Sequence, residues 1–151
     1  MDRLQELELA FLNINAERPA RRMRLVIADD HAAILETVTR LLAPDFDIIA
    51  TADTGRAALE AIIQLVPDCA VLDISMHDFS GIEVAKHLKA GGSDAKVIFL
   101  TVHEDQDFVE EAITVGAIGY VVKSRLASDL LPALKRALTG DLFISPSIKM
   151  N

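Results

Sequence analysis

Five short apolar runs recur along the chain, and the stretches between them have the period of amphipathic helices. Each run is four or five residues long, which suits a strand buried on both faces and is too short for a buried helix. Strands joined by helices through short loops lie parallel, with right-handed crossovers. The pattern therefore predicts an α/β fold, a doubly wound sheet of five parallel strands with helices on both faces. The runs are residues 25–28, 46–50, 69–72, 97–100 and 118–122.

The predicted helices carry apolar stripes and recognisable ends. Apolar residues keep the spacing i, i+3, i+4, i+7 within residues 59–66 and again in the last helix. Ser80-Gly-Ile-Glu83 has the form of a capping box that opens the third helix. If Ser128 caps the last helix, Pro132 lies in or just after the first turn, where a missing N–H costs least. Helix ends are expected at Pro44, Pro67, Gly91, Gly116 and Gly140.

The domain organisation follows from the same patterns. Residues 1–22 are predicted to be an N-terminal extension that could form a short helix, because Leu4 and Leu7 share one helical face. Residues 23–139 contain all the predicted strands and form the predicted domain. Residues 140–151 are short and polar and are expected to begin a linker, with the output domain absent from this chain.

Charge and composition exclude several classes of protein. Residues 25–151 hold ten basic and nineteen acidic residues, which makes a poor surface for nucleic acid. No apolar run reaches membrane-spanning length, and polar residues interrupt the N-terminus, so neither a transmembrane span nor a signal peptide is expected. The single cysteine, Cys69, lies inside an apolar run as a small buried hydrophobe, which is compatible with a reducing cytoplasm.

Charged and hydroxyl side chains stand directly after four of the five runs. Asp29 and Asp30 follow the first run, Asp73 the third, Thr101 the fourth and Lys123 the fifth. In a parallel sheet these positions lie side by side, so the five side chains should share one small crevice. Three carboxylates that close together stay ionised only with a cation, and a set of hard oxygens suits Mg²⁺. We therefore expect a divalent metal, with Mg²⁺ as the ion.

Such a crevice is suited to phosphoryl transfer. Asp73 would be the nucleophile and form an acyl phosphate, with Lys123 and Thr101 on two phosphoryl oxygens and the metal on the third. Taken singly, each side chain has a plainer interpretation, since the acidic pair could cap a helix, Thr101 could form a turn and Lys123 could be a solvated charge. Their joint occurrence at strand ends favours the functional interpretation.

Four short motifs stand in a fixed order at these strand ends: Val-Ile-Ala-Asp29-Asp30, Leu-Asp73-Ile-Ser-Met, Leu-Thr101 and Gly-Tyr120-Val-Val-Lys123. With these motifs the chain resembles the receiver domain of bacterial two-component response regulators over residues 24–139. The ending Gly-Asp-Leu-Phe-Ile-Ser-Pro is most similar to the NarL/FixJ subgroup, whose members continue into a LuxR-type helix-turn-helix domain. The resemblance implies a flavodoxin-like sheet with strand order 2-1-3-4-5.

The resemblance also implies a signalling phosphoacceptor rather than a turnover enzyme. A sensor histidine kinase or a phosphotransfer protein would supply the phosphoryl group to Asp73. Asp73, Asp30 and the backbone carbonyl of Ser75 would bind Mg²⁺ directly, and Asp29 partly through water. A cytoplasmic protein without membrane contact is implied, together with a phosphorylation-dependent homodimer and nucleic-acid binding only through the absent C-terminal domain.

In such a receiver, Thr101 and Tyr120 would form a switch, because Thr101 moves toward the phosphoryl group and Tyr120 turns inward. His103 and Ser75 would flank the approach of water to the acyl phosphate, and His77 and His103 are candidate modulators of its lifetime. The loop from Met76 to Ser80 departs from the family pattern, since His77 replaces the usual proline. We therefore expect this loop to be less restrained than usual, with Asp78 adding negative charge near the acidic site.

One alternative function stays open from the sequence, and two others lack a residue pattern that they need. A stand-alone or degenerate receiver would act through protein contacts and need no output domain. A haloacid-dehalogenase-type phosphatase also uses a strand-ending Asp, but it needs a second acid two residues later, where this chain has Ser75. A flavodoxin-like FMN carrier would have a hydroxyl-rich loop after the first strand, where this chain has Asp29-Asp30-His31.

Overall fold

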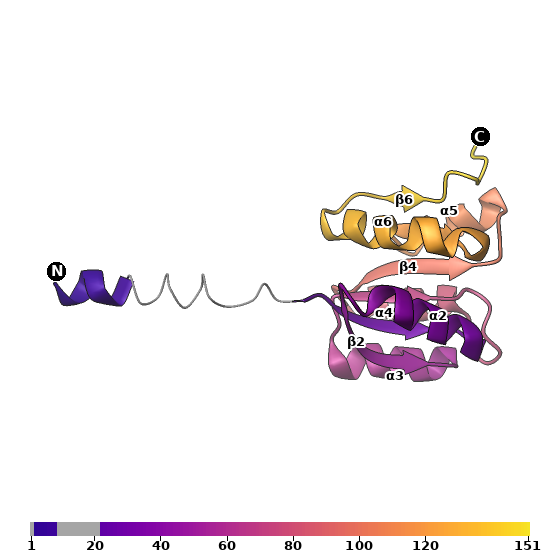
Figure 1. Ribbon diagram of the computed structural model, residues 1–151. Coiled ribbons are helices and arrows are strands. Elements are labelled where there is room, and N and C mark those ends of the chain that lie inside the picture. Colours follow the sequence, from indigo (N-terminus) through magenta and orange to yellow (C-terminus); the bar gives the residue numbers. More distant parts are fainter. Residues whose placement is uncertain (1, 9–21) are drawn as a thin grey trace.

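The computed structural model describes residues 2–8 and 22–151. Residues 3–8 are helical, and the remainder of the predicted extension up to residue 21 lies outside the described residues. From Arg24 onward, strands and helices alternate (Figure 1). The strands are β1 (Arg24–Ala28), β2 (Asp47–Ala52), β3 (Cys69–Leu72), β4 (Lys96–Thr101), β5 (Gly119–Val122) and β6 (Phe143–Ile144). The helices are α2 (Ala32–Leu42), α3 (Gly55–Leu65), α4 (Gly81–Ala90), α5 (Gln106–Thr114), the short 3-10 helix η1 (Lys123–Arg125) and α6 (Leu126–Leu138).

The strands form one parallel sheet in the order β2-β1-β3-β4-β5-β6. Figure 1 shows β6 and α6 at one end of this order and β2 and α3 at the other. Both faces of the sheet are covered. One apolar cluster joins the strands to α3, α4 and α5 through residues such as Ile62, Leu88 and Val109, and the other joins them to α2 and α6 through Val38 and Leu130. The predicted doubly wound α/β fold and the strand order 2-1-3-4-5 are confirmed.

Cys69 is fully buried in β3, as expected for a small apolar group. Burial, reinforced by the nearby Asp68 carboxylate, raises the pKa of the Cys69 thiol to about 11. The thiol therefore stays protonated and unreactive at neutral pH. Among the helices in the described part of the chain, none combines the length and the hydropathy that a bilayer crossing needs.

The segment after α6 folds back onto the domain, where the sequence suggested only the start of a linker. Its two-residue strand β6 pairs in parallel with β5, so that the sheet has six strands where five were expected. The Ser145 N–H then donates to the Tyr120 carbonyl at 2.9 Å, and Ile148 is 7% exposed. This short strand has no alternating pattern of its own, because two residues are too few to show one.

A buried hydroxyl ties this segment to β5 and α6. Ser145 is 1% exposed, its Oγ accepts from the Val122 N–H at 3.1 Å, and it donates to Asp129 Oδ2 at 2.8 Å. Burial raises the pKa of the Asp129 carboxyl, but hydrogen bonds from Arg125, Ser145 and Ser128 more than offset this effect, and the net pKa is lowered. The charged Asp129 carboxylate thus orients the Ser145 hydroxyl so that its oxygen accepts from the N–H of Val122, the residue before Lys123.

Replacing Ser145 with Ala should destabilise the domain by about 1–3 kcal/mol, because the Val122 N–H would be left buried without a partner. Urea unfolding followed by circular dichroism measures the change, with Ser147→Ala as the control in the same segment. A free energy of unfolding equal to that of the control variant would show that the Ser145 hydroxyl does not hold the segment in place.

Helix α6 begins earlier than the sequence suggested. Its N-cap is Arg125 and its first residue is Leu126, directly after η1, so the expectation that Ser128 caps this helix is wrong. Pro132 consequently lies inside the helix, beyond the first turn. The 3-10 turn at Lys123–Arg125 runs straight into α6, and sequence periodicity cannot separate a 3-10 turn from the first turn of an α-helix.

Candidate functional site

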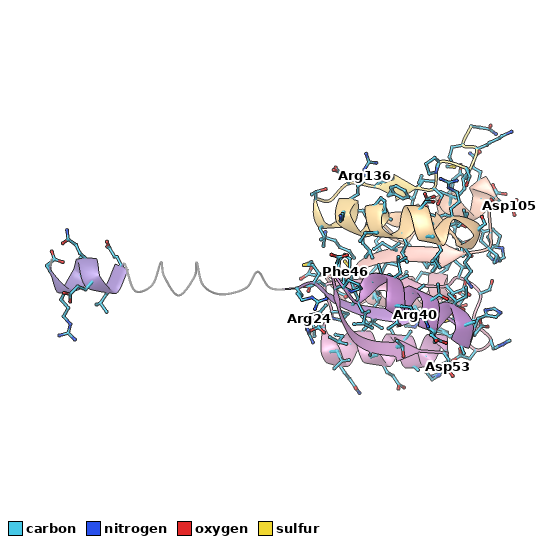
Figure 2. The ribbon with its side chains drawn as sticks, in the orientation of Figure 1. Arg24, Arg40, Phe46, Asp53, Asp105 and Arg136 are labelled. Carbon is cyan, nitrogen blue, oxygen red and sulfur yellow. The ribbon has the colours of Figure 1, made fainter. Side chains whose placement is uncertain are left out.

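The three predicted carboxylates lie together at the carboxyl end of the sheet, on the side where Figure 2 labels Asp53 and Asp105 and opposite Arg24. Backbone hydrogen bonds continue the sheet ladder past the strand ends and fix two of the carboxylates. The Asp29 N–H donates to Ala52 O at 3.0 Å and the Asp73 N–H to Ala28 O at 2.9 Å. The exposed fraction is 2% for Asp29 and 3% for Asp73.

Lys123 completes the cluster, as its position after β5 predicted. Its Nζ lies 2.7 Å from Asp29 Oδ2 and 2.9 Å from Asp73 Oδ2, and its side chain is 10% exposed. Burial lowers the pKa of Lys123, but the hydrogen bonds and charges of Asp29 and Asp73 outweigh burial, and the net pKa is raised. The ammonium therefore stays charged throughout the physiological range and is shared between two carboxylates.

Burial is the main influence on Asp73 and raises the pKa of its carboxyl. The hydrogen bond from Lys123 acts in the opposite direction, and the charge of Asp29 adds to the upward shift. The Ser75 N–H donates to Asp73 Oδ1 at 3.3 Å. Gly81 packs so closely under this loop that a Cβ there would collide with the Asp73 carbonyl, which explains the glycine at the start of α4.

The remaining predicted residues form a connected group beside the carboxylates. Thr101 is fully buried, and its Oγ1 accepts from the His103 N–H at 3.3 Å. Tyr120 is 1% exposed, with its hydroxyl donating to the His103 carbonyl at 2.8 Å. Ser75 Oγ is hydrogen-bonded to His103 Nε2 at 2.7 Å, and the His103 ring stacks on Phe108. Thr101, Tyr120 and Ser75 thus all meet at His103, and Tyr120 points inward.

The loop from Met76 to Ser80 is anchored, contrary to the expectation that the missing proline leaves it less restrained. Asp78 Oδ1 accepts from the Gly55 N–H at 2.9 Å and Oδ2 from the Arg56 N–H at 3.2 Å. Burial alone would raise the pKa of the Asp78 carboxyl, but these backbone hydrogen bonds give a net lowering. Asp78 thus helps to cap the start of α3, and the expectation that its negative charge acts on the metal crevice stays a prediction.

The carboxylate cluster fits a divalent metal. Asp29, Asp30, His31 and Asp73 each offer a ligand atom, and these atoms lie within 4.8 Å of one another. Asp30 Oδ1 is buried without a hydrogen-bond partner, although His31 Nδ1 lies 2.9 Å from it, and Asp29 Oδ2 is buried against the Lys123 ammonium at 2.7 Å. Buried oxygens that lack hydrogen bonds are the acceptors that a hard cation would satisfy.

His31 is the residue of this cluster that the sequence reasoning did not select. Its Nδ1 lies 3.1 Å from Asp29 Oδ1 and 2.9 Å from Asp30 Oδ1. The signal was its place directly after the two aspartates, which also makes it the N-cap residue of α2. His77 lies on the other side of the same carboxylate, with Nε2 at 3.3 Å from Asp30 Oδ2.

Comparison with known proteins agrees with these motifs. The family model for the response regulator receiver domain matches residues 25–135. The transcriptional regulatory protein DegU of Brevibacillus brevis is 32% identical over 140 residues, covering 91% of this chain and 59% of DegU. The uncharacterized transcriptional regulatory protein YvfU of Bacillus subtilis is 36% identical over 131 residues, covering 85% of this chain and 66% of YvfU. The chain thus spans less than two thirds of the length of these relatives.

Two of the solved structures that match are covered over nearly their whole length. The signal receiver domain of the putative response regulator NarL from Mycobacterium tuberculosis is 29% identical with a TM-score of 0.77, covering 80% of this chain and 99% of that one. A LuxR-family two-component response regulator from Aurantimonas is 29% identical with a TM-score of 0.80, covering 85% of this chain and 93% of that one.

Proposed function

The chain belongs to the response regulator receiver domain family, and from this premise we propose that it accepts a phosphoryl group on Asp73 from a histidine kinase or a phosphotransfer protein. The observation that carries the proposal is the buried contact between Lys123 Nζ and Asp73 Oδ2 at 2.9 Å, among the carboxylates of Asp29 and Asp30. This arrangement supplies a nucleophile, a fixed positive charge and a set of metal ligands in one crevice.

The transfer uses few protein groups. An oxygen of Asp73 attacks phosphorus, the bond from phosphorus to the donor's imidazole nitrogen breaks, and the electron pair leaves with the imidazole. Lys123 compensates the negative charge on one equatorial oxygen, and the Thr101 hydroxyl donates to another. Asp30, Asp73 and the Ser75 carbonyl would hold Mg²⁺, with Asp29 partly through water. A bound Mg²⁺ supplies Lewis acidity and orients the phosphoryl oxygens.

Phosphorylation would then act on the surface built from α5, β5 and α6. Thr101, Tyr120 and Ser75 converge on His103, so a shift of the Thr101 hydroxyl toward a phosphoryl oxygen pulls on the segment that Tyr120 holds. His103 and His77 would modulate the lifetime of the acyl phosphate. The expected output is a homodimer formed through this surface.

Replacing Thr101 with Ala should leave phosphoryl uptake largely intact but weaken phosphate-driven dimerisation by roughly tenfold, the worth of one charge-assisted hydrogen bond. Light scattering during size exclusion, with and without a phosphodonor, measures the change. Thr101→Ser keeps the hydroxyl and should dimerise normally. A Thr101→Ala protein that dimerises as strongly as the wild type would rule out this coupling.

The relatives suggest where the signal goes. DegU and YvfU are named transcriptional regulatory proteins, and this chain spans 59% and 66% of their lengths. We propose that the receiver controls a DNA-binding output of the LuxR type within a cytoplasmic regulator. A stand-alone receiver is the alternative, and the length of the open reading frame decides between them.

The test of phosphoryl acceptance is the intact mass of the protein after incubation with acetyl phosphate and Mg²⁺. One added phosphoryl group increases the mass by about 80 Da. The gain should disappear when EDTA removes the metal. Folded protein that gains no mass with Mg²⁺ and acetyl phosphate, and none from a panel of phosphorylated kinases, would contradict the proposal and indicate a degenerate receiver.

A further inference from the structure

A groove opens at the amino end of the sheet, at the opposite end of the strands from the carboxylate crevice, where Figure 2 labels Arg24. It lies between the end of α3, the loop from α4 to β4 and the residues that precede β1 and β3. Its volume is about 540 Å³, which is within the usual range of ligand pockets. The apolar residues that line this amino-end groove are Met23, Ile62, Ile63, Val66, Pro67 and Ala95.

The α3 side of the groove presents apolar side chains to solvent. Ile63 is 63% exposed and Val66 is 72% exposed, and the two are three residues apart at the end of the helix. Their neighbour Ile62 is buried in the core, so the exposed pair lies directly beside the apolar interior. Single exposed apolar residues are ordinary, but apolar residues gathered at a groove are typical of an interaction site.

Val66 also has a backbone conformation that a valine rarely adopts. It is the C-cap of α3, with φ at 48° and ψ at 61°, in the left-handed region that favours glycine or asparagine. Arg24 Nη1 donates to the Val66 carbonyl at 3.1 Å and fixes this conformation. Because the exposed isopropyl group gains little from burial within the domain, its strained placement favours an apolar partner that covers it.

The N-terminal segment carries an apolar face that suits this groove. Residues 3–8 are helical, and Leu4 and Leu7 are three residues apart, so they share one face. The two leucines are 66% and 59% exposed. The Gln5 N–H donates to Asp2 Oδ1 at 2.8 Å at the start of the helix. A helix this short is marginal in water by itself, and burial of its apolar face would stabilise it.

The N-terminal segment joins the domain at the groove itself. Met23 lines the groove and is the residue before β1, and residues 9–21 connect it, through Arg22, to the helix. These thirteen residues span at most about 45 Å when fully extended, so they can bring the helix back to the groove. So short a connection gives the helix a high effective concentration there, which favours it over a helix from another molecule.

We propose that the helix of residues 3–8 docks into the amino-end groove of its own domain, with Leu4 and Leu7 against Ile63 and Val66. The N-terminal segment is then an intramolecular ligand of the receiver. Docking leaves the carboxylate crevice open, because that crevice lies after the strands and the groove lies before them. The proposal therefore does not depend on phosphoryl acceptance by Asp73.

The test measures the effective concentration of two thiols introduced into the full chain. Glu8→Cys places one thiol on the helix, four residues after Leu4 and on the same face. Ser93→Cys places the second thiol in the groove with little change of shape. Ala43→Cys is the matched control, because Ala43 is exposed, lies outside the groove and is next to the tether, where its carbonyl accepts from Arg22.

Each pair of thiols is equilibrated in a glutathione redox buffer at low protein concentration. Intact mass after alkylation gives the fraction of chains with an internal disulfide and, from it, the effective concentration. The native Cys69 thiol does not exchange, because it is fully buried and its pKa is raised to about 11. Thermal unfolding checks that each variant is folded.

The pair Glu8→Cys and Ser93→Cys should show an effective concentration roughly tenfold or more above that of Glu8→Cys and Ala43→Cys, as expected when one leucine is buried. Adding Leu4→Asp and Leu7→Asp should remove the difference. Equal effective concentrations for the two pairs, or a preference for Ser93→Cys that survives both aspartates, would overturn the proposal. A main product of doubled mass would also overturn it, because a second copy would then occupy the groove.

Discussion

Asp73→Asn protein should gain no phosphoryl mass from acetyl phosphate and Mg²⁺, whereas the wild type should gain about 80 Da. The amide has nearly the shape of the carboxylate but no anionic oxygen with which to attack phosphorus. Intact-mass spectrometry measures the result. Asp68→Asn is a suitable control, since Asp68 precedes β3 and lies at the opposite end of that strand. Undiminished labelling of Asp73→Asn would mean that another residue is the acceptor.

The same variant carries a prediction about stability. Burial raises the pKa of Asp73, so the folded protein holds this proton more tightly than the unfolded chain does. Below the ordinary aspartate pKa, Asp73 is neutral in both the folded and the unfolded state and does not change the free energy of unfolding. As the pH rises through the ordinary and then the raised pKa, ionisation costs stability. In metal-free buffer at neutral pH, Asp73→Asn should therefore unfold at a higher temperature than the wild type, and at low pH the two should converge.

Lys123→Met should slow phosphoryl uptake by roughly 10²–10³-fold, which is the cost of removing one preorganised group from a developing charge. Lys123 is the cation found between Asp29 and Asp73 in the described structure, at 2.7 and 2.9 Å. The rate of mass gain under saturating Mg²⁺ measures the effect. Lys96→Met, at the opposite end of β4 from Thr101, should keep the wild-type rate.

The Lys123 variant should also lose stability when the metal is removed. The raised pKa of Lys123 means that its charged form stabilises the fold at every pH below that raised pKa. Without the ammonium, Asp29 and Asp73 face each other as buried carboxylates, which costs about 3–5 kcal/mol for a broken buried ion pair. Mg²⁺ should restore part of that loss. An uptake rate and a metal-free stability both equal to those of Lys96→Met would exclude an electrostatic role for Lys123.

The sheet and the acidic crevice were predictable because their signals are local and repeated. Each buried strand is a short apolar run, and each reacting side chain is the residue that follows such a run, as with Asp73 after β3 and Lys123 after β5. Parallel order then places these positions side by side without further information. Asp29, Asp30, Asp73 and Lys123 are accordingly together in the structure.

The contacts that sequence reasoning missed depend on tertiary geometry. Asp78 follows a polar loop, and nothing in its neighbourhood reveals that the start of α3 lies within reach. His31 has the sequence position of a helix cap, and only the structure brings its ring against Asp30. Ser145 lies in a segment with no periodicity, yet its hydroxyl is buried between Val122 and Asp129. A single hydrogen bond between residues far apart in the sequence does not change the local sequence pattern, so it cannot be predicted from that pattern.

The short strand β6 affects whether two copies of this protein can associate by pairing their sheets edge to edge. Its segment forms hydrogen bonds with main-chain carbonyls along the outer side of β5. The Phe143 N–H donates to Ile118 O at 3.0 Å and the Ser145 N–H to Tyr120 O at 2.9 Å. A bare outer strand is a template for pairing with another chain, and such pairing leads to aggregation. In the part of the chain that the structure describes, the outer strands are β2 and the two-residue β6, whose short length leaves few main-chain groups for another chain to pair with. Uncontrolled sheet-to-sheet association at β5 therefore requires the segment around Phe143 to detach first.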